Sequence, residues 1–173
     1  SEDLFNKHTT HFSCADGEGN WVACTATVNT SFGSKVIIPG TGVIMNNEMD
    51  DFSIAPGVPN AFGLLGAEAN AVAPGKRPLS SMSPTIVLKD GKPILAVGAA
   101  GGPTIITQTL LAIIHTIDFG LPIQEALAQP HFHHQWAPDQ IRIERKIGDK
   151  VLAELRKRGH TLKLYNQMGA TQA

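Results

Sequence analysis

The sequence predicts a layered α+β fold from two strand hairpins and one long, apolar-faced helix that follows the second hairpin. Residues 11–16 and 21–30 are rich in strand-forming residues and flank a turn of Asp, Gly and Asn residues. Residues 85–89 and 93–97 flank a second turn, Asp90-Gly91-Lys92. Antiparallel hairpins combined with separate helices are typical of sheets covered by helices, in an α+β or αββα arrangement.

The second strand of the first hairpin separates its side chains into two faces, because successive residues of a strand point to opposite sides. One face is apolar and consists of Val22, Cys24, Ala26 and Val28. The other face is polar and carries Thr25, Thr27 and Asn29. A hairpin of this kind offers hydroxyl and amide groups on one side only.

Between the two hairpins we expect one short strand, at residues 42–46, and then a long loop at residues 47–78. The loop is predicted because this stretch is rich in Gly, Pro, Ala and Asn and has no hydrophobic period. A loop of this length inside a domain usually forms or covers a functional site.

The long helix is predicted to begin at Thr104, whose hydroxyl would cap it, and to end at Gly120. Its apolar stripe at helical spacing consists of Ile106, Leu110, Ile113, Ile114 and Ile117. A short helix at 123–128, a strand at 141–145, a helix at 149–158 and a strand at 161–165 are expected to follow.

Composition limits the class of protein. The chain has 173 residues, 42% of them apolar, and a net charge of −1. This length suits one domain with a sizeable core. The absence of a basic excess argues against a nucleic-acid partner. No apolar run reaches the roughly 18 residues that a membrane-spanning helix needs.

The cysteines, Cys14 and Cys24, flank the turn of the first hairpin. The sequence allows two alternatives, a disulfide across the hairpin or two reduced thiols. We favour reduced, packed thiols, because two cysteines do not define a disulfide framework.

Thr9 lies at the mouth of the first predicted strand and is a candidate nucleophile. A threonine hydroxyl needs a base beside it, and at a chain start its own α-amine, with a pKa of about 8, serves as that base. Such chemistry requires cleavage of the bond before Thr9. The alternative is that Thr9 and Thr10 simply start a β-strand, which β-branched residues favour.

Gly101 and Gly102 lie between a predicted strand and the start of the long helix. Residues without side chains let backbone N–H groups approach a ligand, and a helix start favours negative charge, so this pair is a candidate oxyanion hole. The alternative is a tight turn that needs glycine for its shape.

Two polar clusters flank the long loop. Glu48, Asp50 and Asp51 offer carboxylates for a cationic amine or a divalent metal, the alternative being a solvated acidic turn. Ser80 and Ser81 offer hydroxyls for a carboxylate, the alternative being a simple turn after Pro78.

The histidines of the segment His131-Phe132-His133-His134 suggest a metal site at first sight. Their spacing matches no zinc motif and no cysteine is near them, so we predict packed or hydrogen-bonded histidines and no metal.

In combination, these segments are far more specific than any one of them. The order and spacing of the following segments resemble the small subunit of γ-glutamyltranspeptidase: Thr9-Thr10-His11, Thr27-Val28-Asn29, 46–52, 56–60, 76–84, Gly101-Gly102 and 130–136. The segments 46–52 and 76–84 are the most diagnostic. The resemblance runs from Thr9 almost to Ala173.

The resemblance implies the four-layer αββα sandwich of the N-terminal nucleophile hydrolases. It also implies a precursor that cuts itself between His8 and Thr9. Residues 1–8 would then be the end of a large subunit or a pro-segment, and residues 9–173 a small-subunit catalytic region that is incomplete at its C-terminus. The implied partner is the large subunit, in a heterodimer; no cofactor is implied, and the location is the periplasm or the cell exterior.

The resemblance also assigns roles. Thr9 would attack the γ-glutamyl amide of glutathione and related compounds, with Thr27 supporting its hydroxyl and water, an amino acid or a dipeptide accepting the acyl group. The implied oxyanion donors are Gly101 and Gly102. The implied contacts to the substrate are Asn29, Glu48 and Asp51 for the α-amino group, and Ser80 and Ser81, with an arginine of the large subunit, for the α-carboxylate.

Three features depart from the family pattern. Residues 1–8 precede Thr9, Ala99-Ala100 stands where Ser-Pro is expected, and His131 stands where arginine is expected. The alternatives are a related acylase, such as a cephalosporin or glutaryl acylase or a poly-γ-glutamate depolymerase, and an unprocessed protein that only binds γ-glutamyl compounds.

Overall fold

The first sheet is the hairpin of β1 (Thr9–Ala15) and β2 (Trp21–Thr27) in the computed structural model, which describes residues 9–173. Thr9 pairs with Thr27, so the open end of the hairpin brings these two residues together. The predicted strand at 21–30 ends early because Asn29 turns the chain with a φ of 77°. The predicted pro-segment, residues 1–8, lies outside the described residues, and so does one side of the predicted cleavage site at the His8–Thr9 bond.

The second sheet consists of β3 (Thr85–Lys89), β4 (Lys92–Ala100) and β8 (Ala170–Gln172), in the order β3-β4-β8. It lies against the first sheet, and the ring of His11 on β1 occupies the space that a side chain at Gly98 of β4 would need. Both predicted hairpins are therefore confirmed. β8 was not expected from the sequence.

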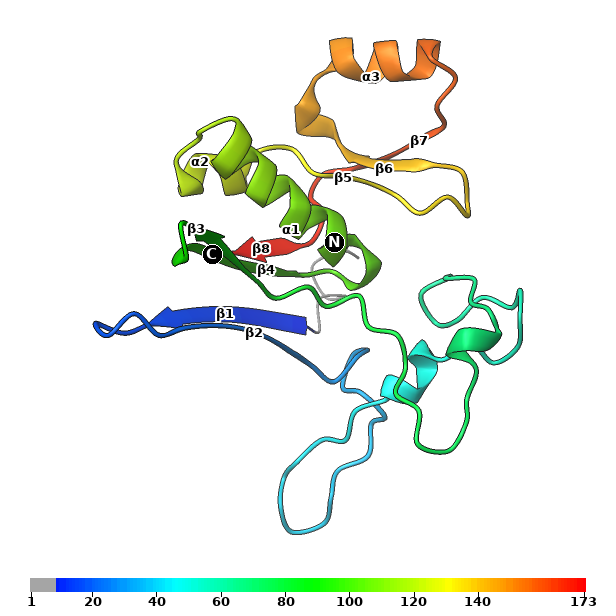
Figure 1. The fold of residues 1–173 in the computed structure, drawn as a ribbon. Helices are drawn as coiled ribbons and strands as arrows, with labels where there is room; N and C mark the ends of the chain where they lie inside the picture. The colour runs from blue at the N-terminus through cyan, green and yellow to red at the C-terminus, as the bar shows by residue number, and fades with distance from the viewer. Residues whose placement is uncertain (1–8) are drawn as a thin grey trace.

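Helices α1 (Ile105–Ile113) and α2 (Ile123–Ala128) cover the face of the second sheet that is turned away from the first (Figure 1). A π-helical turn, Ile114–Asp118, extends α1, and Gly120 follows with a φ of 66°. The core between helices and sheet consists of Leu95, Val97 and Ala112, packed against Val87, Ile113, Ile123 and Leu127. The order helix, sheet, sheet confirms the predicted layered α+β class.

The outer face of the first hairpin is the apolar one. Phe12 is 53% exposed and Val22 49% exposed, whereas His11 on the opposite face is buried. The polar face of β2, with Thr25 and Thr27, therefore points inward. Cys14 and Cys24 are free thiols; Cys14 is exposed, so the expectation that both are packed is wrong for it.

A third sheet contains β5 (Phe132–His134), β6 (Ile141–Glu144) and β7 (Leu162–Tyr165). β6 and β7 are parallel and are connected through the 3₁₀ turn Arg145–Ile147 and helix α3 (Asp149–Lys157), which lies over this sheet in Figure 1. The predicted strands and helix of this region are confirmed. β5 was missed, because its histidines show no strand pattern.

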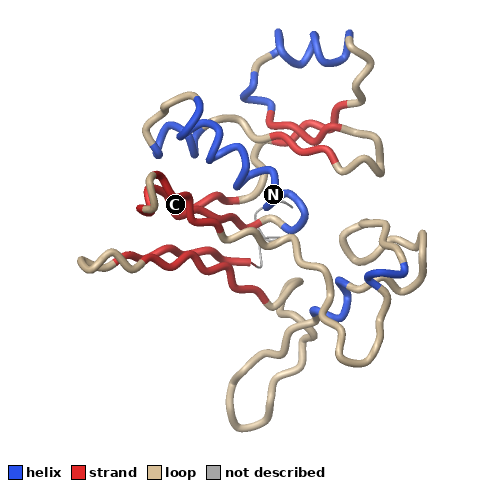
Figure 2. The backbone as a smooth tube through the Cα atoms, viewed as in Figure 1, coloured by secondary structure: helices blue, strands red, loops and turns tan. Residues whose placement is uncertain are grey.

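The segment between β2 and β3 is a long loop, drawn as tan tube in Figure 2. Its regular parts are two 3₁₀ turns, Glu48–Asp51 and Glu68–Asn70. The predicted strand at 42–46 is wrong: only Ile44 forms a bridge, to Ile37, since Gly40 and Gly42 turn the chain with φ of 77° and 72°. None of the helices in residues 9–173 has the length and apolar character needed to cross a bilayer.

Candidate active site

A cavity of about 520 Å³ lies where the open end of the first hairpin, the β4–α1 turn and the long loop meet. Every residue to which the family resemblance assigned a role contributes to its lining, whereas Asp50 does not. The residues with an assigned role are Thr9, Thr27, Asn29, Glu48, Asp51, Ser80, Ser81, Gly101 and Gly102. Residues separated by up to 93 positions in the chain are thus brought to one chamber.

Thr9 and Thr27 are joined through their hydroxyls, whose oxygens lie 3.0 Å apart. The backbone N–H of Asn29 donates to the Thr27 hydroxyl oxygen at 2.9 Å. This contact fixes the Thr27 oxygen beside the Thr9 hydroxyl. A hydroxyl held in this way stabilises negative charge that develops on the neighbouring oxygen.

His11 braces the strand that carries Thr9. Its ring nitrogens lie 2.7 Å from the Thr25 hydroxyl and 3.1 Å from the Ser13 hydroxyl, between the two sheets. Its backbone N–H donates to Gln172 Oε1 at 3.0 Å. Burial lowers the pKa of His11 below its ordinary value of 6.5, which favours the neutral ring at neutral pH.

Glu48 and Asp51 form an acidic pair on the first 3₁₀ turn. Burial, together with the neighbouring Asp51 carboxylate, raises the pKa of Glu48 to about 7. Burial also raises the pKa of Asp51, against the hydrogen bonds from the Glu48 side chain and from the Asn29 side chain, the latter at 3.3 Å. Glu48 Oε1 is buried and has no hydrogen-bond partner among the described residues. An unpaired buried carboxylate oxygen in a cavity is suited to a cationic ligand.

Asn29 links this pair to the first hairpin. Its side-chain N–H₂ donates to the carbonyl of Asn47 at 3.1 Å as well as to Asp51, and the Asn47 side chain accepts from the Thr30 N–H at 3.0 Å. The loop that holds the carboxylates is therefore anchored within two residues of Thr27.

Gly101 and Gly102 form the turn between β4 and α1, with φ of 142° and 57°. A Cβ at Gly101 would lie 2.7 Å from the Thr104 hydroxyl, so glycine is required by space as well as by conformation. The predicted capping role of Thr104 is wrong. Its hydroxyl donates to the Gly101 carbonyl at 2.8 Å, and α1 begins through a 3₁₀ turn, Gly102–Thr104, instead.

Ser80 and Ser81 line the side of the cavity formed by the end of the long loop. The Ser80 hydroxyl accepts the backbone N–H of Met82 at 3.2 Å, which leaves its proton available to a ligand. The Ser81 carbonyl accepts the Ser83 hydroxyl at 3.2 Å. These contacts order the turn and keep both serines at the cavity wall.

Several lining residues were not expected from the sequence, namely Asn60, Phe62, Arg142, Tyr165 and Gln167. Asn60 belongs to one of the quoted family segments, which could have identified it. Arg142 alternates with Ile141 and Ile143 on β6, a pattern that separates it from the apolar face but does not say what it faces.

The histidines of the segment 131–134 have separate partners. His131 lies 3.4 Å from Glu144, His133 lies 2.7 Å from the Gln135 side chain, and His134 lies 2.9 Å from Asp139. Within residues 9–173 no group of His, Cys, Asp and Glu side chains is arranged to hold a metal ion.

His131, at the position where the resemblance led us to expect arginine, lies beside the fully buried Glu144. This carboxylate also accepts the backbone N–H of Met168 at 2.6 Å and pairs with Lys146 at 3.1 Å. Burial by itself raises the pKa of Glu144, but the backbone donors and Lys146 lower it below its ordinary value. Glu144 therefore fixes Met168, which lines the cavity.

Comparison with known proteins identifies the family. A sequence profile of gamma-glutamyltranspeptidase matches residues 3–173. The chain belongs to the γ-glutamyltranspeptidase family. It is 50% identical over 168 residues to the glutathione hydrolase proenzyme of Escherichia coli strain K12, which covers 97% of this chain and 29% of that protein. The chain thus spans less than a third of the length of such relatives.

The solved structures confirm the fold. A mutant γ-glutamyltranspeptidase of Helicobacter pylori matches with a TM-score of 0.90 and 50% identity, over 94% of this chain and 88% of that chain. A cephalosporin acylase of Bacillus halodurans matches with a TM-score of 0.79 and 29% identity, over 93% of this chain and 28% of that one. The chain therefore has the fold of an N-terminal nucleophile hydrolase, as the resemblance implied.

Proposed function

We propose that the protein containing this chain transfers or hydrolyses γ-glutamyl groups of glutathione and related amides through an acyl-enzyme on Thr9. The observation that carries the proposal is the hydroxyl pair of Thr9 and Thr27, 3.0 Å apart, in the same cavity as the unpartnered Glu48 oxygen. A nucleophile and a cation-binding carboxylate in one chamber suit an amide substrate that carries a free amino group.

The reaction has two steps. After cleavage of the His8–Thr9 bond, the α-amine of Thr9 takes the proton of its hydroxyl, and the oxygen attacks the γ-carbonyl carbon. The N–H groups of Gly101 and Gly102 stabilise the resulting oxyanion. The hydroxyl of Thr27 supports the nucleophile. The amide C–N bond then breaks, and the leaving amine takes the proton from the Thr9 amine. Water or an acceptor amine then gives a proton to the Thr9 α-amine and attacks the ester carbon, the bond from that carbon to the Thr9 oxygen breaks, and this oxygen takes the proton back as the γ-glutamyl product leaves.

The amino acid head of the substrate would be bound at both ends. Glu48, Asp51 and Asn29 contact its α-ammonium group, and the hydroxyls of Ser80 and Ser81 contact its α-carboxylate. An arginine of the large subunit completes the carboxylate site. A plain dicarboxylic acyl group has no ammonium, so it gains nothing from the acidic pair.

The proposed partner is the large subunit of the same precursor. Two observations support a covering partner: the apolar outer face of the first hairpin, where Phe12 is 53% exposed and Val22 49% exposed, and the 29% share of the Escherichia coli relative that this chain covers. The description of the Escherichia coli relative as a proenzyme is in keeping with this proposal.

The test uses the complete protein that contains this chain. We expect two bands on a denaturing gel, a new N-terminus at Thr9, and release of p-nitroaniline from γ-glutamyl-p-nitroanilide that increases with glycylglycine. Turnover of glutaryl-p-nitroanilide but not of the γ-glutamyl compound would identify an acylase instead. A single uncut chain that binds but does not cleave γ-glutamyl compounds would identify a binding protein.

A further inference from the structure

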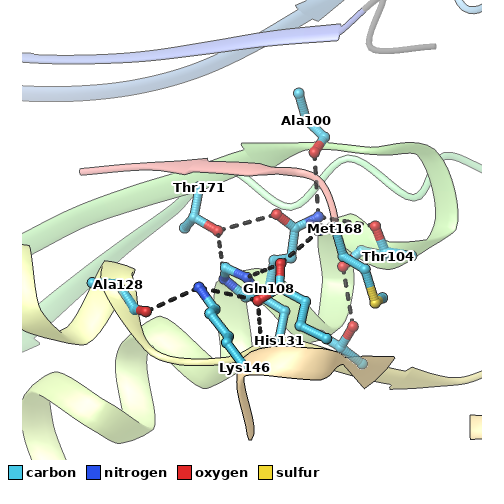
Figure 3. Close-up of polar contacts among 10 residues, drawn as sticks. Ala100, Thr104, Gln108, Ala128, His131, Lys146, Met168 and Thr171 are labelled. Atoms are coloured by element: carbon cyan, nitrogen blue, oxygen red, sulfur yellow. Dashed lines mark hydrogen bonds and ion pairs between the residues drawn. The ribbon is translucent and has the colours of Figure 1, made fainter. Parts of the chain in front are cut away.

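The two peptide units of the Gly101–Gly102 turn are each held from their carbonyl side by a side chain of the helical region. The carbonyl of Ala100 accepts from Gln108 Nε2 at 3.2 Å, and the carbonyl of Gly101 accepts from the Thr104 hydroxyl at 2.8 Å. Gln108 Nε2 also donates to the Thr104 hydroxyl oxygen at 2.9 Å. The close-up in Figure 3 shows Gln108 at the centre of these contacts.

These carbonyls belong to the same peptide units as the N–H groups of Gly101 and Gly102. A trans peptide is planar, and its N–H points opposite to its C=O. The cis peptide of the described residues is Ala137–Pro138, so both units of the turn are trans. Since Gln108 and Thr104 bind the carbonyls from the side of α1, the two N–H groups point away from the helix.

The direction away from the helix is the side of the first hairpin. α1 and the β1–β2 hairpin lie on opposite faces of the second sheet (Figure 1). Thr9, Gly101 and Gly102 line the same cavity. We infer that Gln108 and Thr104 are positioning residues that aim the Gly101 and Gly102 N–H groups at the oxygen of the substrate carbonyl. This inference rests on the proposed function.

The donor and the acceptor of each hydrogen bond in this network can be assigned. The Ala100 carbonyl can only accept, so the nitrogen of the Gln108 amide must face it. Gln108 Oε1 then accepts the hydroxyl of Thr171 on β8 at 3.1 Å. The Thr104 hydroxyl accepts from Gln108, so its own proton goes to the Gly101 carbonyl. Such a chain polarises both peptides and makes their N–H groups stronger donors.

Burial makes the arrangement rigid. Gln108 is 1% exposed and Thr104 8% exposed, so water cannot substitute for either partner. A methyl group at Gly101 would lie 2.8 Å from Gln108 Nε2, and one at Gly169 would overlap the Gln108 side chain. Both glycines leave the space that Gln108 fills. A substitution at either glycine would therefore disturb this network as well as the backbone.

The experiment compares Thr104→Val with Thr104→Ser in the complete, processed protein. Valine keeps the shape of threonine and removes the hydroxyl, whereas serine keeps the hydroxyl. Loss of a single oxyanion donor costs about 10²–10³ in kcat, and misalignment of donors that remain should cost less. We expect Thr104→Val to lower kcat for γ-glutamyl-p-nitroanilide by roughly 10- to 100-fold with KM changed by no more than about twofold. Thr104→Ser should stay within about threefold of wild type.

The chain offers a matched control in Thr109 on the same helix. Thr109 is 3% exposed, and its hydroxyl has no hydrogen-bond partner among the described residues. Thr109→Val removes a buried hydroxyl without touching the glycine turn, so its kcat should equal that of wild type. Gln108→Met tests the other peptide unit in the same way, with the same split between kcat and KM.

The outcomes separate this inference from the proposed function. An active wild type with Thr104→Val and Gln108→Met at wild-type kcat would overturn the inference and leave the function in place. Equal losses in Thr104→Ser and Thr104→Val would also overturn it, because side-chain volume and not the hydroxyl would then be decisive. A processed wild type without γ-glutamyl turnover would overturn the function and the inference with it.

Discussion

The two ends of the cavity are built in different ways. The proposed reaction end, defined here as Thr9, Thr27, Gly101 and Gly102, lies at the ends of paired strands and beside the start of α1. The recognition end, defined as Glu48, Asp51, Ser80 and Ser81, lies on the long loop, whose regular parts are short 3₁₀ turns. Reacting groups need a fixed geometry, which regular elements supply, whereas groups that select a substrate are often carried by loops.

The two ends also differ in charge. Hydroxyls, amides and backbone groups hold the reaction end together. The recognition end contains the carboxylates of Glu48 and Asp51, whose pKa values are raised mainly by burial. Changes at the reaction end should therefore act on kcat, and changes at the recognition end on KM and on its pH dependence.

The largest effect is expected for Thr9→Ala. Removal of the nucleophile should abolish both self-cleavage and turnover, with a loss of about 10⁴-fold or more in kcat, while the fold is retained. Gel analysis and p-nitroaniline release measure the two steps separately. Thr10→Ala is the matched control, because Thr10 is exposed on the opposite face of β1 and should be processed and active. Normal cleavage of Thr9→Ala would place the nucleophile elsewhere.

A smaller effect, confined to recognition, is expected for Asp51→Ala. Loss of a charged hydrogen bond of about 1.5–3 kcal/mol should raise KM for the γ-glutamyl substrate by roughly 10- to 150-fold. Self-cleavage should be less affected, since it needs no ammonium site. Asp50→Ala is the control, because Asp50 is exposed and its partner is the Asn47 side chain at 2.7 Å. Equal losses of cleavage and turnover would indicate a folding role for Asp51.

The pH dependence of KM should report the ionisation of Glu48 at the recognition end. The pKa of Glu48 is raised to about 7, so the acidic pair gains negative charge as the pH rises through this value. KM for the γ-glutamyl substrate should therefore fall by several-fold between about pH 6 and pH 8. Glu48→Gln should flatten this profile while KM stays high. An unchanged profile in Glu48→Gln would assign the titration to another group.

The smallest effect is a gain in stability. The folded pKa of Glu48 lies above its ordinary value of 4.5, so ionisation of Glu48 costs stability, and this cost appears as the pH rises from about 4.5 through 7. Glu48→Gln should therefore raise Tm by a few degrees at pH 8, and the gain should vanish below the ordinary pKa. A Tm gain of the same size at pH 4 would contradict an ionisation origin.

Both hairpins and the longer helices were predicted from the sequence, whereas the shortest strands were not. Hairpins are local, since Asp90-Gly91-Lys92 and the turn after Ala15 fix strands on both sides. β5 and β8 have three residues each and carry no pattern of their own. They are strands because β5 pairs with β6, the next strand along the chain, and β8 pairs with the distant β4. A pairing of this kind is invisible in either partner alone.

The site shows the same division. Nine of the residues that line the cavity were found because their order matches a family, while the other lining residues and all of the contacts required the fold. Thr104 is the clearest example: a threonine before a helix predicts a cap, yet its hydroxyl donates to the Gly101 carbonyl. That difference follows from the left-handed turn at Gly102, which begins the helix region with a 3₁₀ turn.

The first hairpin shows most clearly what the sequence determined and what the tertiary structure decided. The sequence by itself determined that β2 has an apolar and a polar face, because side chains alternate along a strand. Only the tertiary structure decided which face is internal. The polar face with Thr25 and Thr27 lies against the second sheet, and Phe12 and Val22 are exposed. The physical reason is that the ring of His11, on the same face as Thr9, packs against Gly98 of β4 and forms a hydrogen bond with the Thr25 hydroxyl, so the apolar side of the hairpin is turned outward.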